Sequence, residues 1–256
     1  MRRATRGTRT IRRSAEVRIG CAGWSIATRQ AHLFGDGDSA LARYATRFDV
    51  VEINSTFHRA HQPKTFERWA ASVPVGFRFS VKLPRTITHD ARLVRTSSLI
   101  AAFAGQVAGL GQRLGGVLVQ LPPSLLFDAR TAGHFFRALR RAFDVPVACE
   151  PRHASWFGPG VDATWARYGI ARVAADPPKP EGAGHPGGAG TWHYWRLHGA
   201  PRMYYSAYDE QRLAGFASEL EAHGTRQRPA WCIFDNTANS HAVDNALRLI
   251  QLTANS

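Results

Sequence analysis

Short apolar runs alternate along the chain with longer segments in which apolar residues recur at helical spacing. Eight of the runs are rich in β-branched and aromatic residues, as expected of buried strands. They are "VRIGC" (17–21), "VVEI" (50–53), "FRFSVK" (77–82), "GVLVQL" (116–121), "PVACE" (146–150), "IARVA" (170–174), "WHYWRL" (192–197) and "AWCIFD" (230–235). Most of the segments between them open with a capping residue or a proline, such as Asp128 or Pro63, and end in or near a glycine. The pattern therefore predicts strands that alternate with helices.

This alternation indicates an α/β protein with a parallel sheet. Eight strand–helix units in 256 residues match the length of a single (β/α)8 TIM-type barrel, so we predict this fold rather than an open doubly wound sheet. Between the sixth and seventh strands, "DPPKPEGAGHPGGAGT" is too rich in proline and glycine for a regular helix. It predicts an irregular connection, either a mobile lid or a permissive insertion. We expect residues 17–254 to form one domain and residues 1–16 a disordered basic tail.

Polar residues gather at the C-terminal ends of the predicted strands. In "PVACE", Glu150 shares a face with Ala148, while Val147 and Cys149 share the other face, because side chains alternate along a strand. If the apolar pair meets the helices, Glu150 points into the barrel mouth, where this fold places its active sites. The strand ends and the residues just after them supply Glu52, Asn54, Lys82, Gln120, Glu150, Arg152, Asp176, Arg196, His198 and Asn236. These residues predict either a ligand site or a salt-bridge network that closes the barrel.

The formal net charge is +14, with 33 Lys and Arg residues against 19 Asp and Glu residues. Six arginines lie within residues 1–15, but the rest of the chain is basic as well. A basic surface favours phosphate-bearing partners. We therefore expect an anionic or sugar-like small molecule as ligand and keep nucleic acid open as a partner, while protein partners stay unknown at this level.

Cysteine usage and hydropathy bear on location. Cys21, Cys149 and Cys232 lie far apart in apolar segments, which predicts three buried free thiols in a reducing cytoplasm. No run approaches the ~18 apolar residues of a membrane span, and residues 1–16 lack the apolar centre of a secretory signal. We expect a cytoplasmic protein without a membrane partner.

Several co-linear motifs resemble those of the YecE-like proteins, the domain of unknown function 72. They are "GCAGWS", "FDVVEINSTFHR", "RFSVKLPRTITHD", "VLVQLPPSL", "CEPRHASW", "YWRLHG" with "YYSAY", and "IFDNT", spread over about residues 17–252. The resemblance implies a (β/α)8 barrel of the endonuclease IV and xylose isomerase type, and thus a phosphate-bearing or sugar-like ligand at the strand ends. Two positions depart from the family pattern: His58 replaces a usual tyrosine, and Asp235 a usual asparagine.

The residue types at the strand ends suggest acid–base chemistry on an anion. We assign Glu150 as general base, His198 as general acid or electrostatic stabiliser, and Glu52 as a second carboxylate. The remaining strand-end residues would bind the ligand, with Trp24 and Trp156 as stacking platforms.

We predict no cofactor and no resident metal. A divalent metal is the alternative, held by residues drawn from Glu52, His58, Glu150, Asp176, His198, Asp235 and His241. Against it, the nearby lysine and arginines would repel a cation, and no H-E-x-x-H spacing is present.

Three functions fit these residues. The first is hydrolysis of a phosphorylated or nucleic-acid-related substrate, which is our prediction. The alternatives are a sugar or sugar-phosphate isomerase or lyase that uses the same acids, and a non-catalytic protein whose barrel mouth binds an anion or a partner.

Overall fold

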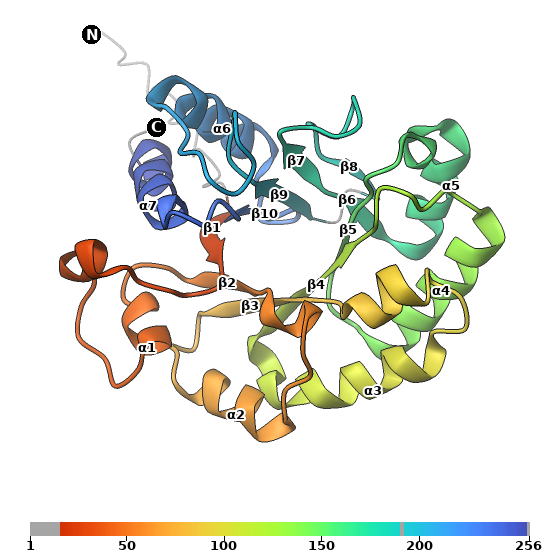
Figure 1. Ribbon diagram of the computed structural model, residues 1–256, viewed down its shortest axis with the longest axis horizontal. Helices are drawn as coiled ribbons and strands as arrows, with labels where there is room; N and C mark the ends of the chain where they lie inside the picture. The colour runs from red at the N-terminus through yellow and green to blue at the C-terminus, as the bar shows by residue number, and fades with distance from the viewer. Residues whose placement is uncertain (1–15, 190–191, 255–256) are drawn as a thin grey trace, which may run out of the picture.

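A barrel of mainly parallel strands surrounded by helices forms the body of the protein (Figure 1). The computed structural model describes residues 16–189 and 192–254. The predicted basic tail, apart from residue 16, lies outside the described residues. The strands are β1 (Val17–Ala22), β2 (Val50–Ile53), β3 (Arg78–Lys82), β4 (Leu114–Gln120), β5 (Val147–Glu150), β6 (Ile170–Arg172), β7 (Ala174–Asp176), β8 (Gly187–Gly188), β9 (His193–Leu197) and β10 (Ala230–Phe234).

The predicted sixth strand closes the barrel by pairing with two neighbours in turn. It is divided at Val173 into β6, which pairs in parallel with β5, and β7, which pairs in parallel with β9. The Val173 N–H donates to the Cys149 carbonyl at 2.9 Å. The other strands follow in the order β9, β10, β1, β2, β3, β4, β5. All eight predicted strands are confirmed, and together they make a nearly closed TIM-type barrel.

Seven α-helices among the described residues form an outer ring: α1 (Ala40–Tyr44), α2 (Pro63–Ala71), α3 (Ser97–Val107), α4 (Ala129–Ala142), α5 (Pro159–Tyr168), α6 (Glu210–His223) and α7 (His241–Ala254). Their starts follow from capping chemistry, because the Ser39, Asp128 and Asp209 side chains each accept a backbone N–H three residues further on. Pro63 and Pro159 begin two others. No helix in the described part of the chain is long and apolar enough to cross a membrane.

Short helical turns and one irregular connection complete the chain. The turns are η1 (Thr28–Leu33), η2 (Ser55–Phe57), η3 (Thr86–Asp90), η4 (Ala108–Arg113) and η5 (Ala154–Phe157). In the described part of the connection between β7 and β9, the two-residue strand β8 pairs antiparallel with β6 in place of a helix. The predicted irregularity between the sixth and seventh strands is therefore confirmed.

Two apolar layers follow from the alternation of side chains along each strand. Val147 and Cys149 pack in the layer between sheet and helices, whereas Ala148 packs with Leu118 inside the barrel. Trp192, just before β9, also lies inside, and Gly116 of β4 leaves room for its ring. A Cβ atom on Gly116 would come within 2.5 Å of the Trp192 ring. Bulky rings therefore fill the N-terminal part of the barrel, and the inner positions further along the strands remain for polar residues.

Candidate functional site

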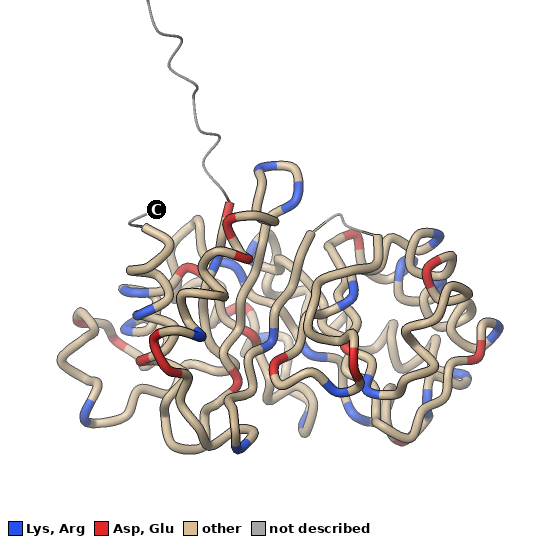
Figure 2. Tube along the Cα trace, turned by 90° about the horizontal axis from the view of Figure 1, so that it is seen from above, with Lys and Arg blue, Asp and Glu red and all other residues tan. Residues whose placement is uncertain are grey.

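Three buried charged residues meet inside the barrel near its C-terminal end. Glu52 lies on β2, Glu150 at the end of β5 and Arg196 on β9, and none is more than 2% exposed. Figure 2 shows acidic and basic positions interspersed within the trace as well as along its rim. The predicted convergence of these strand ends therefore holds, and the charges that meet there are of opposite sign.

Arg196 is the centre of this cluster. Its Nη2 lies 2.8 Å from Glu52 Oε1 and 3.0 Å from Asp235 Oδ2, and its Nε lies 3.1 Å from Glu52 Oε2. Its Nη1 lies 2.7 Å from Glu150 Oε2. Burial alone would lower the pKa of Arg196, but Glu52, Asp235 and Glu150 hold that pKa well above its ordinary value. One guanidinium thus joins the ends of β2, β5 and β10.

Glu150 accepts hydrogen bonds from four side chains. Arg196 and Gln120 donate to Oε2 at 2.7 and 2.9 Å, and Arg152 and His198 donate to Oε1 at 2.9 and 3.1 Å. Burial would raise the pKa of this carboxyl, but the positive charges of Arg196, His198 and Arg152 outweigh it and hold the pKa well below its usual range. Glu150 is therefore ionised, and both of its carboxylate oxygens accept hydrogen bonds.

His198 lies between two carboxylates. Its Nδ1 is 3.0 Å from Asp235 Oδ2 and its Nε2 is 3.1 Å from Glu150 Oε1. Burial lowers the pKa of His198, but the charge of Glu150 and the hydrogen bonds to both acids raise it above its ordinary value. Since both acceptors are ionised, both ring nitrogens donate, and the imidazole is held as a cation.

Two members of the cluster were not among the predicted site residues. Asp235, the departure from the family pattern, pairs with Arg196 and His198. Tyr194 donates its hydroxyl proton to Glu52 Oε2 at 3.0 Å and bonds Ser80 Oγ at 2.7 Å. The sequence did contain a signal for both, because Asp235 ends the eighth strand and Tyr194 shares a strand face with Arg196.

Lys82, at the end of β3, lies beside this cluster without joining it. Its side chain is buried, and Nζ lies 4.2 Å from the centre of the Phe57 ring. In the described part of the chain, Nζ makes no hydrogen bond or ion pair. Burial, with repulsion from Arg196, lowers the pKa of Lys82 to about 8. The lysine is thus a desolvated cation whose charge is only partly compensated.

A cleft of about 320 Å³ opens onto one side of the cluster. Glu150, Arg152 and His198 face it, together with Lys179 from the irregular connection after β7 and Met203 from the loop after β9, two residues that were not among the predicted site residues. Glu52 and Arg196 lie deeper and do not line it. The cleft is where a small ligand could reach the charged cluster.

Several predicted ligand-binding residues have other partners. Asp176 pairs with Arg212 of α6, and its Oδ1 is buried without a partner in the described structure. Asn236 donates from Nδ2 to the Ser206 carbonyl and to Asn245 Oδ1. Asn54 is half-buried, and its Oδ1 also finds no partner among the described residues. These three do not join the cluster, and their role as ligand contacts stays a prediction.

Of the two tryptophans proposed to stack a ligand, Trp156 is buried in the protein, whereas Trp24 is partly exposed and its role stays a prediction. Trp156 is 1% exposed, its indole N–H donates to the Leu125 carbonyl at 2.8 Å, and its ring stacks on Trp165. Trp24 meets the edge of Trp69 at a centroid distance of 5.0 Å. Trp156 therefore belongs to the hydrophobic core, because its ring is almost fully buried and its indole N–H has a partner.

Metal ligation finds no support in the arrangement of donors. Within residues 16–189 and 192–254, no group of three or more His, Cys, Asp and Glu side chains is placed to hold a metal ion. His198 directs both nitrogens at carboxylates, and His58 is exposed on η2's C-terminal side. Among the alternative ligands named above, Glu150, His198 and Asp235 are engaged with one another or with Arg196, and the absence of a metal stays a prediction.

The protein is therefore a TIM-type barrel with a cluster of buried ion pairs near the C-terminal ends of its strands. The family model described as "Protein of unknown function DUF72" matches residues 18–256. The chain belongs to this family.

Named relatives and solved structures agree with that assignment. The UPF0759 protein YecE of Escherichia coli is 31% identical over 137 residues, which are 52% of this chain and 49% of the relative, so the match spans about half the length of that protein. The UPF0759 protein YunF of Bacillus subtilis is 22% identical over 92% of this chain and 94% of its own. A DUF72 family protein from Thermotoga maritima superposes with a TM-score of 0.76 at 23% identity, covering 93% of this chain and 99% of the other.

A more distant barrel shares the fold alone. D-allulose 3-epimerase from a Methylomonas species superposes with a TM-score of 0.52 at 10% identity, over 95% of this chain and 99% of its own. At this identity, the likeness supports the TIM-type fold and says nothing about the ligand of this protein.

Proposed function

We propose that the cleft at the barrel mouth binds a small phosphorylated molecule. The supporting observation is the charge balance of the cleft: Arg152, Lys179 and cationic His198 line it, whereas Glu150, the one carboxylate among its described lining residues, already accepts four donors. The Arg152 side chain is 22% exposed, so its guanidinium can reach both Glu150 and a ligand. An arginine fork and a lysine point charge suit phosphate oxygens.

A second candidate function is hydrolysis of the bound phosphate ester, favoured by the cationic His198 in the same cleft. Phosphoryl transfer depends more on positioning and on positive charge than on a strong base. In the proposed step, a water oxygen attacks phosphorus and the bond from phosphorus to the alcohol oxygen breaks. In this step the Nε2–H of His198 leaves Glu150 Oε1, turns to that alcohol oxygen and gives it the proton, and the proton released by the attacking water restores the imidazolium through solvent.

Glu150 fits a counter-ion better than a general base. Its pKa lies well below the usual range, because Arg196, His198 and Arg152 compensate its burial. A base works best with a pKa near the working pH, so abstraction of a sugar proton by Glu150 is disfavoured. This argues against the isomerase alternative. A carboxylate that already accepts hydrogen bonds from four side chains is as compatible with a site that only binds an anion as with a hydrolase.

Calorimetric titration with inorganic phosphate and glycerol 3-phosphate near neutral pH tests the proposal. We expect saturable binding that Arg152→Gln weakens about tenfold or more. The matched control is Arg68→Gln, an exposed arginine on α2 without an ion pair in the described structure. Equal binding by the Arg152 variant and the control, or no binding by the unmodified protein, would overturn the phosphate site. Turnover of p-nitrophenyl phosphate that His198→Gln abolishes would establish the hydrolase.

A further inference from the structure

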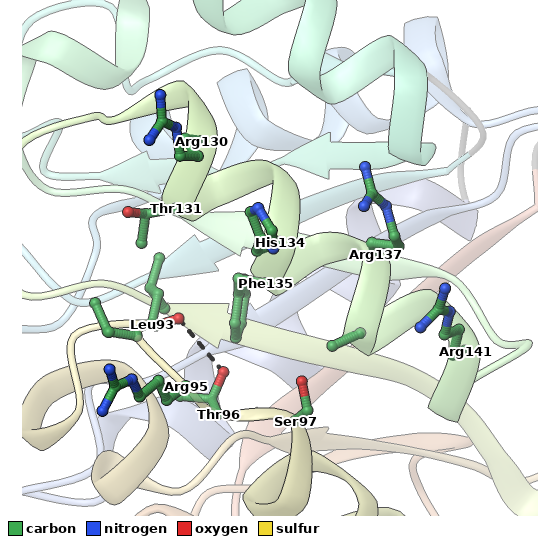
Figure 3. Close-up of a pocket in the computed structure, with 12 residues that line it drawn as sticks. Leu93, Arg95, Thr96, Ser97, Arg130, Thr131, His134, Phe135, Arg137 and Arg141 are labelled. Atoms are coloured by element: carbon green, nitrogen blue, oxygen red, sulfur yellow. Dashed lines mark hydrogen bonds between the residues drawn. The ribbon is translucent and has the colours of Figure 1, made fainter.

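A groove runs along the outer wall of the barrel between α3 and α4, away from the mouth. Its largest hollow, about 380 Å³, lies between the segment 93–97 and α4 (Figure 3). A second hollow of about 340 Å³ shares Ser97, Ala138 and Arg141 with it. A third, of about 290 Å³, shares Leu93, Val94 and Thr131. Because the hollows share residues, we treat them as one depression, the α3–α4 groove.

Basic side chains form the rim of this groove. Arg130, His134, Arg137 and Arg141 recur every three or four residues, so they lie along one face of α4. At 1.5 Å per residue, the row is about 16 Å long. Figure 3 shows Arg95 on the opposite side of the hollow, from the segment that precedes α3. All five side chains are exposed.

Among the described residues, these charges have few acidic partners. The 380 Å³ hollow has no Asp or Glu among its lining residues. Within the described residues, the side chains of Arg95, Arg137 and Arg141 make no hydrogen bond or ion pair. Arg130 lies near Asp128, but that carboxylate caps α4 through the Thr131 N–H. The rim therefore offers a row of positive charge to an acidic partner.

The floor of the groove is apolar and consists largely of small side chains. Leu93, Phe135 and Ala138 line the main hollow, and the adjoining one is lined by Ala101, Ala104 and Ala142. Small side chains let another backbone approach closely. No aromatic face is offered there, because Phe135 is only 1% exposed. Sites for single-stranded nucleic acid usually provide aromatic rings for base stacking, so this floor suits a peptide better.

The segment beside the groove has an unusual backbone. Arg92, Leu93 and Arg95 have φ values of 48°, 69° and 52°. Non-glycine residues in this left-handed region cost of order 1 kcal/mol or more each, and such outliers cluster at ligand clamps and switch regions. Here they place Val94, which is 53% exposed, and Arg95 beside the hollow.

We propose that the α3–α4 groove docks an acidic amphipathic helix of a partner protein. The helix lays an apolar stripe on the alanine floor and against exposed Val94, and its Asp and Glu side chains meet the arginines on the rim, as in helix-in-groove recognition. A second copy of this chain is a poor occupant, since the net charge of +14 makes copies repel one another. The proposal is independent of the phosphate site at the barrel mouth.

Fluorescence anisotropy with a labelled acidic amphipathic peptide of about 18 residues tests this. The probe has leucines on one face and glutamates on its flanks, and a scrambled peptide of the same composition is the comparison. We expect the unmodified protein to bind the amphipathic probe at least about fivefold more tightly than the scrambled one. Arg137→Glu with Arg141→Glu should weaken binding about tenfold or more. The equally charged control, Arg47→Glu with Arg68→Glu at exposed positions after α1 and on α2, should change it less than about threefold.

Ala138→Arg separates docking from simple charge attraction. It adds a positive charge but fills the floor, so groove docking predicts weaker binding and non-specific attraction predicts tighter binding. The proposal is overturned if Ala138→Arg binds the amphipathic peptide more tightly, or if the unmodified protein binds the scrambled peptide as tightly as the amphipathic one. So does preferential binding of a duplex DNA of matched charge that the Arg137/Arg141 variant loses, since this would assign the surface to nucleic acid. Thermal unfolding of each variant confirms that it is folded.

Discussion

The guanidinium of Arg196 and the carboxylate of Glu150 form a 2.7 Å ion pair in which the side chains are 0% and 2% exposed. Removing both charges from water is costly, and their mutual attraction alone often does not repay it. Here the remaining donors and acceptors are also used, because Arg196 bonds Glu52 and Asp235 while Glu150 bonds Gln120, Arg152 and His198. The pair is stable as part of a complete network, and breaking the network at its centre should be costly.

Arg196→Leu should destabilise the fold strongly. The substitution leaves the carboxylates of Glu52, Glu150 and Asp235 buried without their shared cation, and removing one partner of a buried pair costs about 3–5 kcal/mol. Urea denaturation should show this loss in the free energy of unfolding. Arg68→Leu on the surface of α2 is the control and should change it by less than about 0.5 kcal/mol. A loss below about 1 kcal/mol for Arg196→Leu would contradict the central role of this residue.

Glu150→Gln distinguishes a counter-ion from a base. An amide oxygen still accepts from Arg152 or His198, but the charge that matches them is lost, so stability should fall by about 1–3 kcal/mol. Phosphate affinity should be retained or increased, because the cleft becomes more positive. Calorimetry and denaturation together measure both effects. If phosphate binding were unchanged but a measured turnover disappeared, Glu150 would act as a base after all.

The fold could be predicted from the sequence because the alternation of side chains along the strands and the capping residues of the helices indicated the same elements. Val147 and Cys149 face the helices while Ala148 faces the barrel interior, as the period of two requires. The cap at Asp128 and the proline at position 63 begin helices where the sequence placed them. The division of the sixth strand at Val173 was not predictable, because it depends on which neighbours the strand meets when the barrel closes.

The sequence predicted which residues lie in the candidate site better than it predicted which of them form hydrogen bonds and ion pairs. Alternation identifies the residues that point inward, and it placed Glu52, Glu150 and Arg196 together. It cannot tell that Asp176 would pair with Arg212 from a distant helix, since that contact depends on the tertiary arrangement of α6. Trp156 follows a strand end yet turns into the core, because Trp165 and the Leu125 carbonyl offer it a complete set of partners.

Lys82→Met should stabilise the protein at neutral pH. Burial and then Arg196 lower the pKa of Lys82 from 10.5 to about 8, so the charged lysine costs stability in the folded state. At 1.36 kcal/mol per pKa unit, the gain from removing it is roughly 3 kcal/mol. As pH rises from about 8 to 10.5, the native lysine loses its proton before the unfolded one does, so the native protein gains stability over this window and the advantage of Met disappears.

Urea denaturation at about pH 7 and about pH 10 measures this difference. Lys64→Met, at an exposed position in the first turn of α2, is the matched control and should be nearly neutral at both values. Destabilisation by Lys82→Met at neutral pH would mean that the lysine is stabilised by contacts beyond its cation–π neighbour. Stabilisation would instead mark Lys82 as a residue retained at a cost to stability, which is common at functional positions.

The charge of His198 should govern the pH dependence of anion binding. Burial lowers its pKa, but Glu150 and Asp235 raise it above 6.5, so the imidazolium contributes stability that is complete below about that pH and is lost as pH rises through the folded-state pKa. Sulfate is a suitable probe because it stays dianionic between about pH 6 and pH 9, whereas imidazole charge changes in that range. Its affinity should therefore decline above the folded-state pKa of His198.

In His198→Gln the decline of sulfate affinity should vanish over the lower part of the pH range, leaving a weaker and nearly constant affinity. Arg68→Gln should keep the pH profile of the unmodified protein. An unchanged pH profile in His198→Gln would show that another group, such as Lys82 with its pKa of about 8, controls the charge of the cleft.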